Sequence, residues 1–149
     1  MKERLKRFRR LLLEIEIEEH RRKVLTEIDG FASDKAKATI DSRLRRLWRE
    51  EERERRELSE IVEMLPLPEQ RQVIFARYFD GHAWCGVAHL LFGRRPDYWT
   101  KQDSYERRVY RIHGEALANA NRISAGKPHS RRQKRRFVRV SAGRTGKKR

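Results

Sequence analysis

Two stretches decide the fold of this chain: residues 69–92 read EQRQVIFARYFDGHAWCGVAHLLF, and residues 103–122 read DSYERRVYRIHGEALANANR. Apolar residues recur in both at intervals of three and four, which places them on one face of an α-helix. Asp80-Gly81 interrupts the first stretch, because this pair is a typical helix stop. The pattern predicts three helices, over 69–79, 82–92 and 103–122, and a loop over 93–102.

The helix expected over 103–122 has two opposite faces. Its apolar stripe comprises Tyr105, Val109, Ile112, Ala116, Ala120 and Ile123, whereas Arg107, Arg111, Gly114 and Ala118 fall on the other side. Recognition helices read DNA bases with their N-terminal residues, and arginine can bond guanine through two atoms. We therefore expect base contacts from Arg107 and Arg111, with Glu106, Arg108 and Tyr110 as neighbours. An ordinary solvated face is the alternative for the arginines, and a capping box with Asp103 is the favoured role of Glu106.

The loop over 93–102 carries cations and aromatic residues. Arg94, Arg95 and Lys101 are expected to contact phosphates, which set the register of a protein on DNA without reading its sequence. Tyr98 and Trp99 could stack on a base. We favour the other role, in which they fix the loop against the core, because large aromatic side chains mostly pack.

The first 65 residues predict a long helical hairpin, with helices over 2–29 and 36–65 joined by a loop over 29–35. The apolar stripe of the first helix is Leu5, Phe8, Leu12 and Ile15, and we expect Leu11, Leu13, Ile17, Val24, Leu25 and Ile28 to widen or continue it. The second helix has heptad-like Ile40, Leu44, Leu47, Leu58, Ile61 and Leu65. Its stretch 49–57 holds only arginine and glutamate, which indicates a solvated stretch of helix stabilised by opposite charges three and four residues apart. We expect the hairpin to pack on itself, with pairing to a second copy as a homodimer as the alternative. Its role is either in recognition or that of a plain spacer.

The composition shifts at both ends of the central region. Pro66 and Pro68 separate the hairpin (1–65) from a helix-turn-helix domain (66–123), which we take as the packed core. Residues 124–149 hold eleven lysines or arginines and no acid, which predicts a disordered basic tail. Its expected role is to grip phosphates, and the candidate residues there are Arg131, Arg132, Lys134, Arg135 and Arg136. The net charge of +16 on 149 residues suits a polyanionic partner, and double-stranded DNA is the expected one.

Several segments, in order, resemble region 4 of bacterial sigma factors, the helix-turn-helix that reads the upstream promoter element. They are Leu67-Pro68-Glu69, Arg77-Tyr78-Phe79-Asp80-Gly81, Trp84, Val87-Ala88 and the run Arg108-Val109-Tyr110-Arg111-Ile112-His113-Gly114-Glu115-Ala116-Leu117. The resemblance extends to short proteins of phages and mobile elements, the ArpU-like late-gene regulators, and covers about residues 65–120. It implies a transcription regulator that works with bacterial RNA polymerase. The ten residues of the loop 93–102 depart from the family, whose turn has three or four.

Other chemistry finds less support in the sequence. His82, Cys85 and His89 lie near one side of a helix, and zinc would need a further ligand such as His113; surface histidines and one buried cysteine explain the same residues. We expect no metal, no cofactor, no enzymatic activity and no membrane span, and a cytoplasmic, nucleoid-associated protein. Two other functions remain open: a DNA-recognition subunit like the small terminase of phages, and an RNA or nucleoprotein binder that acts through the tail.

Overall fold

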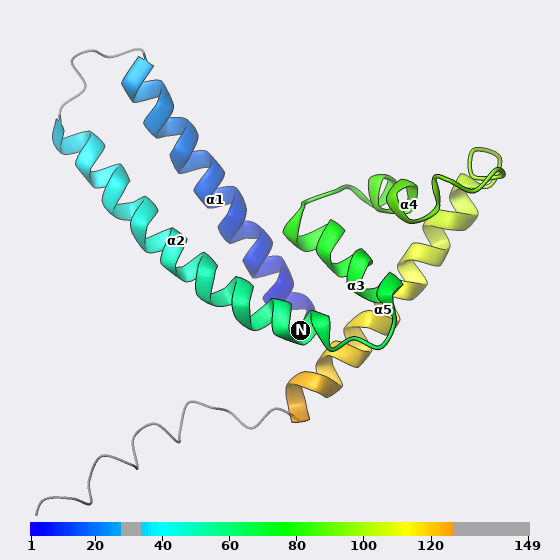
Figure 1. Cartoon of the computed structure of the whole chain (residues 1–149). Coiled ribbons are helices and arrows are strands. Elements are labelled where there is room, and N and C mark those ends of the chain that lie inside the picture. Colours follow the sequence, from blue (N-terminus) through cyan, green and yellow to red (C-terminus); the bar gives the residue numbers. More distant parts are fainter. Residues whose placement is uncertain (28–33, 127–149) are drawn as a thin grey trace, which may run out of the picture.

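The structure is a computed structural model, and it describes residues 1–27 and 34–126, which are all-helical apart from turns and short connections (Figure 1). The elements are α1 (Lys2–Glu27), α2 (Asp34–Glu63), α3 (Pro68–Ile74), a π-helical turn η1 (Phe75–Phe79), α4 (Trp84–Phe92) and α5 (Gln102–Gly126). The all-α class expected from the sequence is confirmed. None of the described helices is long and apolar enough to cross a membrane.

The described helices form two diverging arms (Figure 1). The antiparallel pair α1 and α2 makes one arm, and α5 makes the other, with α3 and α4 packed along it, whereas η1 lies beside α1. The first residue of the chain lies where the arms meet, and the Met1 amino group donates a hydrogen bond to Oδ1 of Asn121 on α5 (2.9 Å). We call residues 68–126 the head.

The hairpin packs on itself, and its seam is more polar than the sequence indicates. The hairpin core consists of Leu11, Ile15, Leu44 and Leu47. The stretch 49–57 is not simply solvated, because Glu51 is buried and Glu54 faces α1. Nε of Arg4 lies 2.9 Å from Glu54, and Arg55 pairs with Glu51 one turn away. The heptad spacing therefore continues through these two glutamates, which arginines neutralise at the positions where a coiled coil would carry apolar residues.

A second core joins the hairpin to the head. This junction core includes Leu5 and Phe8 of α1 and Leu58 of α2, which pack against Phe79 of η1 and Ala116 of α5. The rings of Phe8 and Phe79 are 4.9 Å apart between centroids. The packed core is therefore not confined to the region after residue 66, and the base of the hairpin completes the apolar surface of the head.

The helix expected over 69–79 changes its winding at Phe75. The π-helical turn η1 follows α3, and the Asp80 N–H donates to the Phe75 carbonyl five residues earlier (3.0 Å). A π-helical turn brings residues five apart onto the same side. Ile74, just before this turn, and Phe79, at its end, both enter the junction core.

Three other sequence expectations need correction. Leu13 and Ile17 do not widen the buried stripe of α1, since they are 41% and 56% exposed. Helix α4 begins at Trp84 rather than at residue 82, although Gly81 ends η1 with a φ of +80°, as a helix stop requires. Helix α5 runs to Gly126, so residues 124–126 are helical and the expected tail starts too early. The rest of that tail, with its five expected phosphate contacts, and most of the loop over 29–35 lie outside the described residues.

Candidate nucleic-acid interface

Helix α5 is anchored along one side. Val109, Ala116 and Ala120 are buried, and Val109 and Ile112 join the head core with Val73, Val87, Phe92 and Tyr98. Tyr105 and Ile123 lie partly buried at either end of the stripe. The apolar stripe expected from the sequence is therefore confirmed, and it determines which side chains of α5 point outward.

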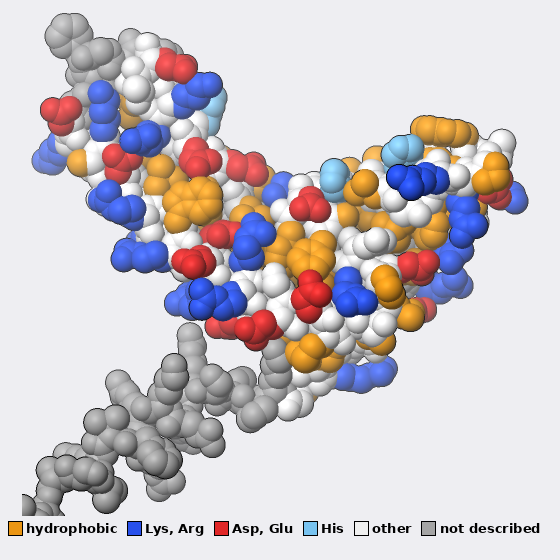
Figure 2. Space-filling view, viewed as in Figure 1, with side chains coloured by type: hydrophobic (Ala, Val, Ile, Leu, Met, Phe, Trp, Pro, Cys, Tyr) orange, Lys and Arg blue, Asp and Glu red, His pale blue; other side chains and the backbone are white. Residues whose placement is uncertain are grey.

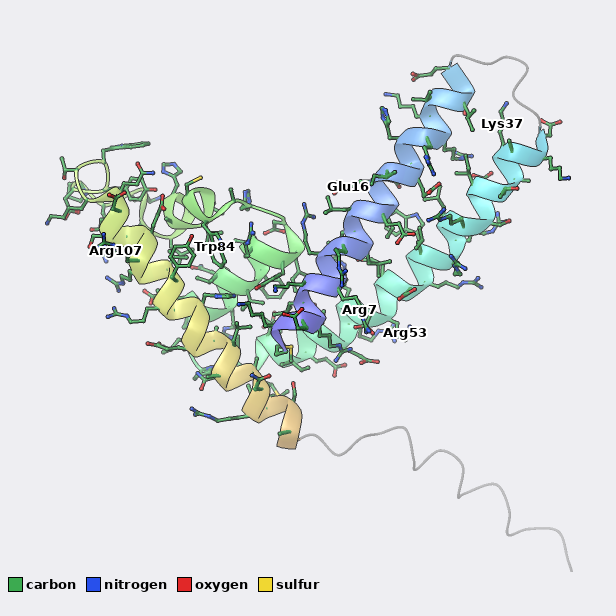
Figure 3. The ribbon with its side chains drawn as sticks, turned by 180° about the vertical axis from the view of Figure 1, so that it is seen from behind. Arg7, Glu16, Lys37, Arg53, Trp84 and Arg107 are labelled. Atoms are coloured by element: carbon green, nitrogen blue, oxygen red, sulfur yellow. The ribbon has the colours of Figure 1, made fainter. Side chains whose placement is uncertain are left out.

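The two arginines of the outward face are free. Arg107 and Arg111 are exposed, and neither has a hydrogen bond or an ion pair among residues 1–27 and 34–126. Gly114 and the exposed Ala118 continue this face toward the C-terminal end, and a Cβ atom at Gly114 would have nothing within 4 Å. In Figure 3 the labelled Arg107 lies at the end of α5 far from the hairpin. We call Arg107, Arg111, Gly114 and Ala118 the outward face.

The three neighbours of these arginines have partners within the protein. The Arg108 guanidinium lies over the Phe92 ring, 4.9 Å from its centroid, and 4.0 Å from the Glu69 carboxylate. Tyr110 packs its half-exposed ring against Trp84 with centroids 4.9 Å apart. Glu106 accepts a hydrogen bond from Nε2 of Gln102 (3.2 Å). Asp103 lies inside α5 rather than ahead of it, so the expected capping box is not where the sequence places it.

The connection from Gly93 to Lys101 is a chain of turns fastened to α5. The Tyr105 hydroxyl donates to Oδ1 of Asp97 (2.7 Å), and Nζ of Lys101 lies 3.0 Å from the same carboxylate. The hydrogen bond from Tyr105, aided by Lys101, lowers the pKa of the Asp97 carboxyl below its usual value. Asp97 is therefore ionised at neutral pH and holds the loop beside the first turns of α5.

The two aromatic residues of the loop have different surroundings. Tyr98 is buried in the head core, which confirms the packing role expected for it. Trp99 is 73% exposed, so the expectation that it also packs against the core is wrong; its ring contacts are with Tyr98 and His89. Arg94 and Arg95 are also exposed. Trp99 is thus the aromatic side chain of this loop that stays accessible to a partner.

A groove of about 420 Å³ lies between the loop and α5, beside the point where Asp97 holds them together. Lys101 and Asp97 form its loop side, and Arg107, Arg108 and Arg111 form its helix side, together with Ser104 and Tyr105. Four cations face one carboxylate, so the groove has the sign of charge that attracts a phosphate backbone. The sequence analysis named the cations of this groove but missed Asp97. Its position four residues before Lys101 was the sequence signal for this ion pair.

Behind the outward face, a buried polar pair lies between α5 and η1. The hydroxyl of Tyr78 and Nε2 of His113 are 3.0 Å apart, and the Trp84 ring meets His113 edge-on. Burial, aided by the positive charges of Lys2 and Arg77, lowers the pKa of His113 to about 4. His113 therefore stays neutral at physiological pH. The sequence signal for the burial of His113 was its position next to Ile112, which belongs to the buried stripe of α5.

Metal-ligand candidates are scattered. His82, Cys85 and His89 are not buried, so the expectation of a buried cysteine is wrong, and His113 is held elsewhere by Tyr78. Within the part of the chain that the structure describes, no group of three or more histidine, cysteine or acidic side chains is arranged to hold a metal ion.

Comparison with known proteins gives no further guide to the function of this arrangement. No protein-family model matches the sequence, and neither the curated proteins nor the solved structures include a similar chain.

Proposed function

We propose that this protein is a sequence-specific DNA-binding transcription regulator, in which α5 enters the major groove and the protein acts together with RNA polymerase. The observation that carries the proposal is the pair Arg107 and Arg111, one helical turn apart, exposed and unpaired on a helix whose opposite side is buried. Free guanidinium groups held on a rigid element can bond guanine O6 and N7 through two atoms.

The cations around α5 divide into two groups in this proposal. Some would read bases, and the others would contact the DNA backbone and so position the protein. Arg108 is held by Phe92 and Glu69, so it reaches less far from α5 than Arg107 and Arg111 do. Lys101 lines the groove beside α5, and Arg94 and Arg95 are exposed on the preceding loop, so these three cations are the candidates for phosphate contacts. Such contacts fix the register in which the two free arginines read the bases. Polymerase as a partner rests on the sigma-like segments alone.

The first test is Arg111→Ala, measured by binding to duplexes from an in vitro site selection. We expect the preferred site to lose about 1–3 kcal/mol of binding free energy and the preference at one base pair to relax. Arg49→Ala is the matched control, because Arg49 is an exposed arginine of α2 without an ion-pair partner in the described ranges. An equal loss on preferred and random duplexes would show that Arg111 touches only phosphate and would overturn base reading by this residue.

Deletion of residues 127–149 separates DNA reading by α5 from binding by the tail. We expect sequence preference to survive the deletion, while the salt dependence of log affinity flattens by about 0.9 for each phosphate that the tail neutralised. Loss of all preference would favour the nucleoprotein alternative. A ring-shaped oligomer in native mass spectrometry would favour the terminase-like alternative, whereas binding to core RNA polymerase favours the regulator.

A further inference from the structure

Helix α1 carries a second stripe on the side away from its buried one. Lys6, Arg10, Leu13 and Ile17 recur at intervals of four, three and four residues, so they align along the helix. Leu13 and Ile17 are exposed, although most aliphatic residues of α1 are buried or partly buried. About half of the surface of each of these two residues stays open to solvent. The stripe therefore offers an aliphatic surface with cations at its N-terminal end.

This stripe begins in a cleft between the hairpin and the head. The cleft has a volume of about 550 Å³ and is lined by Lys6, Arg9, Arg10 and Leu13 of α1 and by Arg77 and Tyr78 of η1, with Glu3 at its edge. In Figure 2 the surface is hollowed between the hairpin and α4, and in Figure 3 the labelled Glu16 lies on the side of α1 toward this hollow. We call this site the α1 cleft.

The α1 cleft has cations that the protein does not neutralise. Lys6 pairs with Glu3 (3.0 Å), and Arg9 lies 3.9 Å from Glu16. Arg10 has no carboxylate within ion-pair distance in the described residues. Arg77 donates to the His82 carbonyl (2.7 Å) and lies over the Trp84 ring, so its charge also remains unpaired there. Arg10 and Arg77 thus supply two positive charges to the cleft, which Leu13 of the aliphatic pair also lines.

The walls of the α1 cleft are held in place. The Arg9 guanidinium lies over Gly81, so a Cβ atom there would displace the end of this arginine side chain. Gly81 has a φ of +80°, which L side chains rarely adopt, so the turn after η1 and the α1 side chain fit each other. The π-helical turn itself presents Arg77, and such turns occur often at functional sites. The cleft is a formed surface rather than a gap between independent parts.

We propose that the α1 cleft and the adjoining stripe bind an acidic, amphipathic segment of a partner protein, with aliphatic residues on Leu13 and Ile17 and carboxylates near Arg10 and Arg77. An amphipathic helix recognises such a surface through apolar anchors one turn apart. A second copy of this chain fits less well, because a symmetric contact centred here would bring the unpaired cations of both copies together. The proposal is independent of the proposed reading of DNA by α5.

The test uses the full chain and a fluorescent synthetic helix with leucines one turn apart along one face and glutamates on both flanks. Its control is a scrambled peptide of the same composition, which exposes purely electrostatic attraction. We expect the amphipathic peptide to bind more tightly than the scrambled one, and Leu13→Ser/Ile17→Ser to weaken its binding about tenfold or more. Arg10→Glu should weaken it as well and reduce the salt dependence of the affinity that remains.

Matched variants make the result specific. Leu90→Ser on α4 and Arg49→Glu on α2 alter side chains of similar exposure elsewhere and should leave peptide affinity unchanged. Thermal unfolding by circular dichroism checks that each variant is folded. Equal binding of both peptides, or equal effects of Leu13→Ser/Ile17→Ser and Leu90→Ser, would overturn the proposal. So would a monomer–dimer equilibrium abolished by Leu13→Ser/Ile17→Ser, which assigns the stripe to a second copy, or a loss of duplex DNA affinity in Arg10→Glu as large as that in Arg111→Ala.

Discussion

The side chain of His113 shows how packing controls a single titratable group next to the outward face of α5. A neutral imidazole can accept a hydrogen bond at Nε2 from the Tyr78 hydroxyl, whereas a protonated one cannot. The folded protein lowers the pKa to about 4, and an unfolded chain has a histidine pKa of about 6.5. Between these values the unfolded state binds more protons, so the free energy of unfolding falls as the pH is lowered from about 6.5 to about 4.

We predict that His113→Gln removes this part of the pH dependence. The contribution of His113 to the loss amounts to about 3 kcal/mol at most, because one pKa unit corresponds to about 1.4 kcal/mol. Urea unfolding measured at several pH values compares the variant with the parent and with His20→Gln, which changes an exposed histidine of α1. Parallel curves for all three proteins would contradict the assignment of this pH dependence to His113.

The elements of the hairpin illustrate a polar seam between helices. Glu18 of α1 is 3% exposed and lies 3.2 Å from Arg43 and 3.1 Å from Arg21. Arg43 also donates to Glu14 (2.7 Å), so this one arginine of α2 holds two acids of α1. A buried carboxylate is costly unless it is paired, whereas an exposed arginine is well solvated. The two partners should therefore respond differently to replacement.

For this seam we predict that Arg43→Met lowers the free energy of unfolding by about 1–3 kcal/mol, because Glu18 then keeps only Arg21. Glu18→Leu should change stability less, or raise it, since leucine continues the apolar stripe of α1 and Arg43 keeps Glu14. Chemical denaturation of both variants measures the difference. A larger loss of stability in Glu18→Leu than in Arg43→Met would contradict this prediction. It would mean that the ion pairs of Glu18 stabilise the hairpin more than a leucine at this position does.

For the whole molecule, the junction core determines whether the two arms unfold together. Phe8 of α1 contacts Phe79 of η1, and the same core includes Ala116 and Ala120 of α5. The Arg55 guanidinium covers both rings, at 5.6 Å and 5.5 Å from their centroids. An isolated head would expose the junction-core side of η1 and α5 to water. The hairpin thus contributes to the support of the helix that carries the outward face.

We accordingly predict that Phe8→Ala destabilises the protein by about 3–5 kcal/mol and lowers protection from hydrogen exchange in α4 as well as in the hairpin. Helix α4 is informative because its buried residues belong to the head core and not to the junction core. Exchange that rises in α1 and α2 alone, with α4 unchanged, would mean that the hairpin and the head unfold as separate units.

Local patterns along the chain were enough to predict the helices and the side of α5 that faces outward, because periodic apolar residues and breakers such as Asp80-Gly81 act over short distances. They correctly separated Arg107 and Arg111 from the buried stripe. The contact of Arg108 with Phe92 and the burial of Glu51 came from packing in three dimensions, since both depend on residues of other helices. The π-helical winding of η1 was likewise not predicted from the sequence, and the side chains just before it and at its end, Ile74 and Phe79, pack in the junction core.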